Sequence, residues 1–210
     1  MLYSELQCSD AIHKAVERMG FAEMTEIQEK TIPVMMAGYD VIAKAPTGTG
    51  KTCAFGIPVA EHILPENKYP QAVIMAPTRE LAQQIAQELE ELTYFMPEVQ
   101  VACVYGGANM EKQAKRLAEG CQIVVATPGR LMDHYKHHSI DISHVTQIVL
   151  DEADEMLNMG FYKDVRHIIE MMKARKSLSM FSATISREVM DIGWLYQHNA
   201  EEITVQPKEE

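Results

Sequence analysis

Seven short apolar segments recur along the chain, and segments with the periodicity of amphipathic helices separate most of them. The apolar segments, each predicted to be a buried strand, are residues 41–43, 72–76, 99–104, 123–126, 148–150, 179–181 and 203–205. The predicted helices are residues 10–19, 26–36, 53–64, 79–92, 110–119, 131–137, 162–175 and 187–196. Strands that alternate with helices are joined by right-handed crossovers into a parallel sheet. The sequence therefore predicts an α/β fold with a mostly parallel central sheet and helices on both faces.

The size and composition of the chain suit one globular domain, because 47% of its 210 residues are hydrophobic and 23% are charged. No apolar run approaches the ~18 residues that a membrane span needs, and the first residues lack the basic and apolar regions of a signal peptide. We therefore expect a cytoplasmic protein that does not bind a membrane. The four cysteines are widely spaced without a CxxC pair, which argues against a zinc site or a thioredoxin-like motif.

The net charge of −11 has the wrong sign for a domain that binds nucleic acid through a broad basic surface. Any contact with nucleic acid must therefore be local. A possible metal site would use His134, His137 and His138, which share one face of a predicted helix. Because no cysteine lies near them, we favour a solvated helix end over a metal site.

The segment APTGTGKT, residues 45–52, lies between the first predicted strand and the next helix, which is the context of a phosphate-binding loop. The glycines allow backbone N–H groups to surround phosphate oxygens, Lys51 can reach the β- and γ-phosphates, and Thr52 offers a hydroxyl to Mg²⁺. Ala45 stands where the general pattern has glycine, so the alternative is an ordinary glycine-rich turn. The residues predicted to bind the nucleotide here are Thr47, Gly48, Thr49, Gly50, Lys51 and Thr52.

A second motif begins where the predicted strand at residues 148–150 ends. Asp151 follows this strand, and its carboxylate is predicted to hold Mg²⁺ beside the phosphate-binding loop, together with Thr52. Glu152 can orient and deprotonate the attacking water. Taken alone, the Asp-Glu pair would be a solvated turn or a helix cap. With the loop, it predicts a site for phosphoryl transfer whose catalytic residues are Lys51, Asp151 and Glu152.

The chain closely resembles the first RecA-like domain of the DEAD-box ATP-dependent RNA helicases. Nearly the whole chain carries the family's motifs in the family's order, namely GFAEMTEIQ (20–28), APTGTGKT (45–52), PTRELA (77–82), GG (106–107), TPGR (127–130), DEAD (151–154) and SAT (182–184). All but the first of these motifs follow predicted strands. The loops after parallel strands emerge at one edge of a sheet, where open α/β folds bind ligands. We therefore expect these motifs to share one edge.

For the first motif, the resemblance implies recognition of adenine. Phe21 would stack on the base, and Gln28, with Thr25, would bind its edge and so select ATP. The alternative is structural, because Thr25 and Gln28 also have the spacing of a capping box. Met24 stands where the family usually has proline, which predicts a less rigid loop before the helix. Tyr3, where the family often has phenylalanine, is assigned to packing.

The resemblance also implies contacts with the RNA backbone by Pro77, Thr78, Arg79, Gly106, Gly107, Thr127, Pro128, Gly129 and Arg130. Their local chemistry agrees, because Thr78 and Thr127 suit N-caps and the N–H groups at helix starts attract phosphate. A few directed donors would explain how an acidic domain binds RNA with little sequence preference. Taken alone, each motif would be an ordinary capped helix or turn.

Three further residues, Asp154, Ser182 and Thr184, are implied by the resemblance to couple the nucleotide site to bound RNA. On physical grounds alone, the two hydroxyls would serve equally well as caps for the helix after Ser186. The coupling assignment therefore depends on the family pattern.

The resulting prediction is an ATP- and Mg²⁺-binding domain of an RNA helicase that separates RNA strands locally. Residues 1–205 would form the first RecA-like domain, with the adenine segment at 1–29, and residues 206–210 would begin a linker to a second RecA-like domain. By resemblance, that second domain supplies arginines to the ATP site and half of the RNA clamp. Alone, this chain would be nearly inactive. The alternatives are a DNA helicase or translocase of the same fold, and a non-catalytic binding module.

Overall fold

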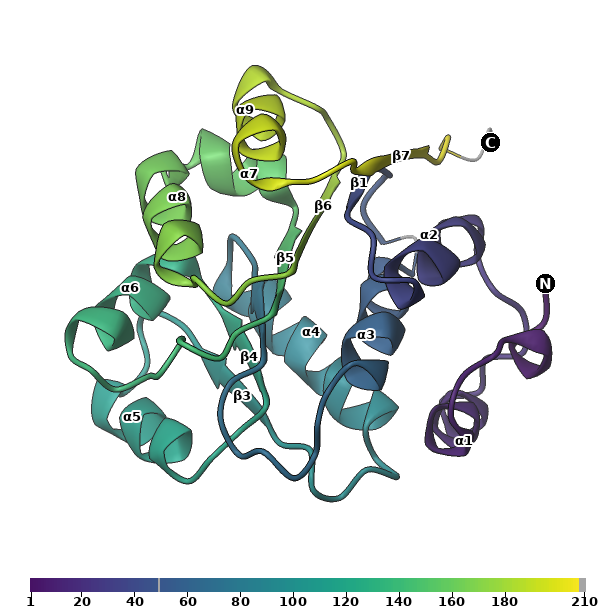
Figure 1. Cartoon of the computed structure of the whole chain (residues 1–210), viewed down its shortest axis with the longest axis horizontal. Coiled ribbons are helices and arrows are strands. Elements are labelled where there is room, and N and C mark those ends of the chain that lie inside the picture. Colours follow the sequence, from purple (N-terminus) through teal and green to yellow (C-terminus); the bar gives the residue numbers. More distant parts are fainter. Residues whose placement is uncertain (49, 208–210) are drawn as a thin grey trace.

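The computed structural model of the chain describes residues 1–48 and 50–207. Within these residues a single sheet holds seven strands, and all of its strand pairs are parallel (Figure 1). The strands are β1 (Val41–Lys44), β2 (Ala72–Met75), β3 (Val101–Val104), β4 (Ile123–Ala126), β5 (Gln147–Asp151), β6 (Ser177–Ser182) and β7 (Glu201–Thr204). All seven predicted strands and the parallel α/β fold are therefore confirmed.

Helices cover both faces of the sheet. One face carries α1 (Asp10–Arg18), α2 (Glu26–Met36), α3 (Lys51–Glu61) and α4 (Arg79–Leu92). The other carries α5 (Met110–Ala118), α6 (Pro128–Lys136), α7 (Ala153–Asn158), α8 (Tyr162–Met171) and α9 (Arg187–Tyr196). Because successive strand residues face opposite ways, Ile74 packs in the first core, whereas Val73 and Met75 pack in the second.

Two differences from the predicted elements bear on the site. Helix α7 was not predicted, because it has only six residues and such a length shows no helical periodicity. Helices α3 and α6 begin at Lys51 and Pro128, two or three residues earlier than predicted. Both helices therefore begin inside the motifs, which brings helix N-terminal N–H groups to the ligand edge.

The strand order explains how the motifs share one edge. The order is β3-β4-β2-β5-β6-β1-β7, and parallel strands end on the same side of the sheet. The three strands on one side, β3, β4 and β2, lead into residues 106–107, 127–130 and 77–82. Strand β1 leads into the phosphate-binding loop, and β5, which ends with Asp151, stands between the two groups. The motifs therefore lie along a single edge in two neighbouring groups, one after β3, β4 and β2 and the other after β1, with Asp151 between them.

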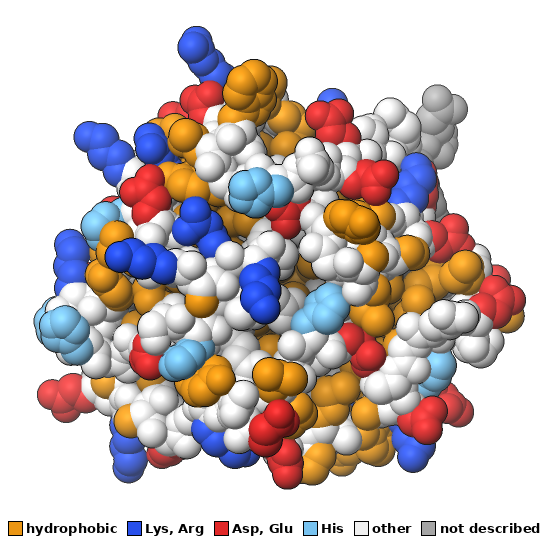
Figure 2. Space-filling model, in the orientation of Figure 1, with side chains coloured by type: hydrophobic (Ala, Val, Ile, Leu, Met, Phe, Trp, Pro, Cys, Tyr) orange, Lys and Arg blue, Asp and Glu red, His pale blue; other side chains and the backbone are white. Residues whose placement is uncertain are grey.

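No helix in the described part of the chain is both long and apolar enough to cross a membrane. On the face shown in Figure 2, Lys and Arg side chains are mixed with neutral and acidic ones rather than merged into one broad basic surface. This arrangement agrees with the acidic net charge of −11. Any contact of this face with a polyanion must therefore use a few individual residues.

Candidate functional site

The phosphate-binding loop turns from β1 into α3 through two glycines in the left-handed region. The φ angles of Gly48 and Gly50 are +81° and +78°, and Gly50 is the N-cap of α3. A Cβ on Gly50 would lie 2.7 Å from Nε2 of Gln28, so this position combines a positive φ with a close approach. Thr47 and Gly48 are exposed, and Thr49 lies outside the described residues.

Lys51 and Asp151 form a buried ion pair at the centre of the edge. The Lys51 Nζ lies 3.3 Å from Asp151 Oδ1, with side chains only 6% and 2% exposed, and 3.9 Å from Glu152 Oε1. Burial raises the pKa of Asp151, and the Lys51 ammonium opposes that rise. The three residues predicted to be catalytic are therefore brought together by the fold.

Glu152 has a left-handed backbone, with φ of +49° at the N-cap of α7. This conformation costs a residue with a side chain about 1–3 kcal/mol, so the surrounding structure must hold it. Burial raises the pKa of Glu152, and the neighbouring Asp151 raises it further, whereas Lys51 lowers it. A carboxylate with a raised pKa is better matched to proton transfer near neutral pH.

A second carboxylate near the loop was missed from the sequence. Glu88, half-buried on α4, lies near Asp151 and the hydroxyl of Thr52, and both of them affect its pKa. Burial raises the pKa of Glu88, and the Thr52 hydroxyl opposes that rise. Hydroxyl and carboxylate oxygens are the donors that Mg²⁺ prefers, so Thr52 and Asp151 have the chemistry of a magnesium site.

The segment predicted to recognise adenine is anchored to the phosphate-binding loop. Gln28 is 3% exposed, accepts a hydrogen bond from the Thr25 N–H at 3.0 Å, and donates one to the Gly50 carbonyl at 3.1 Å. The predicted capping box is therefore present. Tyr3 is buried as predicted, but its hydroxyl also donates to Oε1 of Gln28. Phe21 is 44% exposed, which leaves its ring open to a ligand.

Met24 does not leave the loop before α2 unsupported. Its side chain is only 8% exposed and belongs to the core. Its N–H donates to the Met1 carbonyl at 2.9 Å, and the Tyr3 N–H donates to the Ala22 carbonyl at 3.0 Å. Backbone pairing with the first residues therefore holds this loop, and its lower rigidity than with proline stays a prediction.

Asp154, Ser182 and Thr184 form one network beneath the edge. The Thr184 hydroxyl and N–H donate to Asp154 Oδ2 at 2.7 and 3.2 Å, and the Asp154 N–H donates to Ser182 Oγ at 3.1 Å. Burial alone would raise the pKa of Asp154, but the hydrogen bonds outweigh it and hold the pKa below its ordinary value. The cap of α9 is Ser186 itself, whose Oγ accepts from Val189 at 3.2 Å. The two predicted coupling hydroxyls are therefore tied to the DEAD segment rather than to α9.

Replacing Thr184 with valine is expected to raise the pKa of Asp154 toward its ordinary value, because the carboxylate loses its shortest hydrogen bond. A depressed carboxyl pKa stabilises the fold above the unfolded pKa of about 3.9, and this contribution is lost as the pH falls through the folded pKa. The stability gap between wild type and variant should therefore narrow on acidification. NMR titration of the Asp154 carboxyl carbon measures the shift. The exposed Thr204→Val is the matched control, and an unchanged Asp154 pKa in Thr184→Val would refute the assignment.

The segments predicted to contact RNA also come together. Thr78 caps α4, with its Oγ1 accepting from Leu81 at 3.2 Å. The Arg79 guanidinium lies 4.8 Å from the ring centroid of Tyr105, which directly precedes the exposed Gly106 and Gly107. Arg130 donates to the Ala108 carbonyl at 3.0 Å, on the other side of the glycines. These segments therefore form one connected surface.

Two expectations for this surface need correction or refinement. Thr127 is the N-cap residue of α6, as predicted, but its side chain makes no capping hydrogen bond. The N–H groups at the start of α6 are therefore left for another acceptor. Pro128 is at the first helical position, as predicted. Pro77 and Pro128 are buried, whereas Gly129 is half-buried. The two prolines therefore restrict the backbone of their loops and are not themselves exposed to a ligand.

The histidine cluster differs from the predicted solvated helix end. His137 and His138 are exposed, but His134 is fully buried, and its Nε2 lies 3.0 Å from Oε1 of Gln113. Burial lowers the pKa of His134. The described residues contain no group of three or more His, Cys, Asp or Glu side chains arranged for a metal. His134 is therefore part of the polar interior of the fold.

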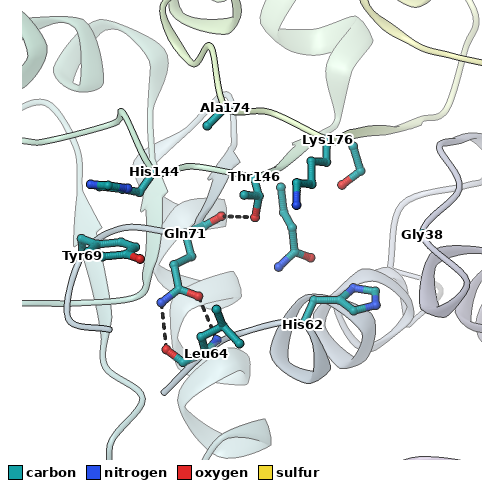
Figure 3. Close-up of a pocket in the computed structure, with 11 residues that line it drawn as sticks. Gly38, His62, Leu64, Tyr69, Gln71, His144, Thr146, Ala174 and Lys176 are labelled. Carbon is teal, nitrogen blue, oxygen red and sulfur yellow. Dashed lines mark hydrogen bonds between the residues drawn. The ribbon is translucent and has the colours of Figure 1, made fainter. Parts of the chain in front are cut away.

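A cavity of about 500 Å³ lies at the opposite, amino edge of the sheet (Figure 3). It is lined by residues around the starts of β2, β5 and β6, with the rings of Tyr69 and His144 stacked 4.0 Å apart. Gln71 closes one wall through hydrogen bonds to the backbone of Leu64. None of its lining residues belongs to the motifs, so this hollow is separate from the candidate site.

A family model described as DEAD/DEAH box helicase matches residues 25–192. This range includes most of the chain, the ion pair of Lys51 and Asp151, and the three segments of the connected surface. The chain belongs to the DEAD/DEAH box helicase family. The seven-stranded parallel sheet is of the RecA-like type.

Relatives in this family extend beyond the chain. An ATP-dependent RNA helicase CshA from Limosilactobacillus reuteri is 46% identical over 209 residues, which are 100% of this chain and 42% of that protein. A helicase with the same description from Listeria monocytogenes is 46% identical, with 99% of this chain matching 40% of that protein. The crystal structure of a DEAD box protein from Methanococcus jannaschii matches 98% of this chain and 56% of its own, at 39% identity and a TM-score of 0.91. The chain therefore spans about half or less of the length of these DEAD-box relatives.

Sequence reasoning missed two residues of this DEAD-box domain, Gln113 and Glu88, and one contact, the hydrogen bond from Tyr3 to Gln28. Gln113 had a usable signal, because it is a polar residue on the same side of α5 as the buried Leu117. Glu88 had none, since its contact with Thr52 joins two helices that are distant in sequence. The hydrogen bond of Tyr3 to Gln28 had none either, because it depends on how residues 1–24 fold back on α2.

Proposed function

We propose that this chain is the ATP- and RNA-binding domain of an ATP-dependent RNA helicase, which couples ATP hydrolysis to local RNA unwinding or RNA–protein remodelling. One observation carries the proposal. The buried pair of Lys51 and Asp151, 3.3 Å apart, lies at the same sheet edge as the connected surface of residues 77–79, 106–108 and 127–130. Hydrolysis and RNA contact would therefore occur on one rigid body.

In this proposal, Lys51 leaves Asp151 to bind the β- and γ-phosphates of ATP, and the N-terminal N–H groups of α3 bind the same phosphates. Thr52 and Asp151 would hold Mg²⁺, which supplies charge neutralisation during phosphoryl transfer. Glu152 orients the attacking water and accepts its proton. Phe21, Thr25 and Gln28 would bind the adenine, with the ring of Phe21 against the base. Each of these side chains has the chemistry that its proposed role needs, and none of the roles requires a different backbone fold.

RNA would lie across the connected surface through its backbone. The N–H groups that begin α4 and α6 point to the edge, and Arg79 adds an exposed positive charge. Few donors replace a broad basic surface, as the net charge of −11 requires. The network of Asp154, Ser182 and Thr184 would transmit the state of the nucleotide site, since it begins two residues after Glu152.

The proposal includes a second RecA-like domain in the same full-length protein. Residues 206–207 would begin the linker to it, and the rest of that predicted linker, residues 208–210, lies outside the described residues. Such a domain would supply arginine to the γ-phosphate, a contribution worth about 10³–10⁵ in rate in related phosphoryl-transfer sites. Residues 1–205 alone should therefore bind ATP weakly and turn it over very slowly.

Replacing Arg79 with alanine is expected to weaken RNA binding about equally for all sequences, because a phosphate contact carries no base information. The slope of log affinity against log salt should decrease by about one, the value for one lost phosphate contact. Fluorescence anisotropy with two RNAs of different sequence at several salt concentrations measures both effects. Lys136→Ala, an exposed charge at the far end of α6, is the matched control. A loss confined to one RNA sequence would contradict the proposed mode of binding.

The function itself is tested by the ATPase activity of the full-length protein with RNA, with DNA of the same sequence, and with neither. The proposal expects strong stimulation by RNA. Stimulation by DNA instead would indicate a DNA translocase. ATP binding without turnover under any of these conditions would indicate a non-catalytic binding module.

A further inference from the structure

The side chain of Gln113 on α5 directly connects two segments of the proposed RNA surface, those around the glycine turn and Arg130. Its Nε2 donates to the Tyr105 carbonyl at 3.0 Å. Its Oε1 accepts from Arg130 Nη1 at 3.1 Å and from His134 Nε2 at 3.0 Å. The side chain is only 8% exposed, so water cannot easily replace these partners.

The orientation of the Gln113 amide is determined by its neighbours. A backbone carbonyl can only accept, so the NH₂ group must face Tyr105, and a guanidinium can only donate, so Oε1 must face Arg130. His134 must then carry its proton on Nε2. Its Nδ1 is buried with no partner, and burial lowers its pKa, which both fit a neutral ring. The three hydrogen bonds of the amide are therefore all satisfied by one orientation of Gln113 and one tautomer of His134.

These contacts hold both ends of the glycine turn. Gln113 binds the carbonyl of Tyr105 before Gly106, and Arg130 binds the carbonyl of Ala108 after Gly107. The Arg130 guanidinium that does so is itself held by Gln113. Gly106 and Gly107 are exposed and have no side chains of their own to fix the turn.

The same contacts reach the third segment through Tyr105. Its ring lies under the Arg79 guanidinium at 4.8 Å, and its hydroxyl accepts from Gln83 of α4 at 3.0 Å. A shift of the Tyr105 backbone would therefore move the ring that supports Arg79. The Gln113 amide therefore binds Tyr105 and Arg130 directly, and through them it is connected to Ala108, Arg79 and Gln83.

We propose that Gln113 is a positioning residue for RNA binding, which keeps the glycine turn, Arg130 and Arg79 in the arrangement that fits an RNA backbone. The inference depends on the proposed function, because it assumes that this surface binds RNA. Gln113 does not touch the strand itself. Its loss should weaken RNA binding without affecting ATP, because the residues for phosphate and Mg²⁺ follow β1 or end β5, and β2 and β4 lie between β5 and the strand β3 that leads to the glycine turn.

The test is steady-state ATPase kinetics of the full-length protein carrying Gln113→Met, which keeps the length of the side chain and removes all three hydrogen bonds. We expect the KM for RNA to rise about tenfold, the equivalent of one to two lost hydrogen bonds. The KM for ATP and the kcat at saturating RNA should stay within twofold of wild type. A purely structural defect would instead lower kcat through a smaller folded fraction and leave both KM values unchanged.

Gln113→Glu provides a second variant in case the methionine protein does not fold. It keeps an acceptor for Arg130 and His134 but turns a carboxylate oxygen toward the Tyr105 carbonyl, so the KM for RNA should rise about threefold or more. Gln87→Met, at an exposed site on α4, is the control. An unchanged KM for RNA in the folded variants would overturn the inference and leave the proposed function intact. A wild-type protein that RNA does not stimulate would overturn the proposed function, and this inference with it.

Discussion

Replacing Lys51 with alanine is expected to lower the RNA-stimulated ATPase rate of the full-length protein by about a thousandfold or more, because the ammonium is the main positive charge beside the transferred phosphate. The structure adds a second reason. Asp151, 2% exposed at its side chain, has Lys51 as its ion-pair partner at 3.3 Å. Without that partner, burial raises the pKa of Asp151 further and favours its protonated form, which is a poor ligand for Mg²⁺.

The matched control is Lys173→Ala, which removes an exposed lysine just after α8, away from the motif edge. Its ATPase rate should equal that of wild type. Thermal unfolding of both variants separates a catalytic loss from a folding loss, since breaking a buried ion pair can cost about 3–5 kcal/mol. A folded Lys51→Ala protein that retains more than a tenth of the wild-type rate would show that the loop does not carry the reaction.

The parts of this fold that were predictable are those encoded by neighbouring residues. The strands were recognisable because runs such as residues 72–76 and 123–126 are apolar throughout, as a strand buried on both faces requires. The loop at residues 45–52 was recognisable because its glycines, lysine and threonine act within one turn of chain. Their role in binding phosphate could therefore be predicted without knowing how the rest of the chain folds.

The parts that escaped prediction depend on contacts between distant residues. Gln113 and His134 are 21 positions apart, and nothing near His134 shows that its helix face is buried rather than solvated. Glu88 meets Thr52 only because α3 and α4 lie on the same face of the sheet. One local feature also escaped prediction: Thr127 is the N-cap that its residue type predicts, but whether its side chain makes the capping hydrogen bond depends on the rotamer, which local sequence does not determine.

The strand order gives the proposed coupling a physical route. Strand β5 lies between β2, which leads to Thr78, and β6, which ends in Ser182. Asp151 at the end of β5 contacts Lys51, and three residues later Asp154 contacts Thr184. A change in the phosphates that moves Lys51 or Asp151 would therefore act, three residues along the chain, on Asp154, which is hydrogen-bonded to Ser182 at the end of β6. The short helix α7 starts between these two carboxylates, so its position is sensitive to both.

Replacing Glu152 with glutamine is expected to lower the ATPase rate by about 10²–10⁴-fold while leaving ATP affinity within twofold of wild type. Glutamine has the same shape and can still orient a water, but it cannot accept its proton. The ion pair of Lys51 and Asp151 remains, so the phosphates and Mg²⁺ keep their proposed ligands. The variant should therefore accumulate with ATP bound, and RNA held by it should dissociate more slowly than from wild type.

Glu155→Gln supplies the matched control, because Glu155 is an exposed carboxylate on the same helix, α7. It makes the same chemical change at a residue that acts on Glu152 only through its charge, which contributes to the raised pKa of Glu152, so its turnover should stay close to that of wild type. ATP affinity measured with a fluorescent analogue, beside turnover measured as phosphate release, separates binding from chemistry. If Glu152→Gln lost binding and turnover together, Glu152 would be holding the nucleotide rather than activating water. The left-handed backbone of Glu152, at φ +49°, would then hold its side chain in position to bind the nucleotide rather than to accept a proton from water.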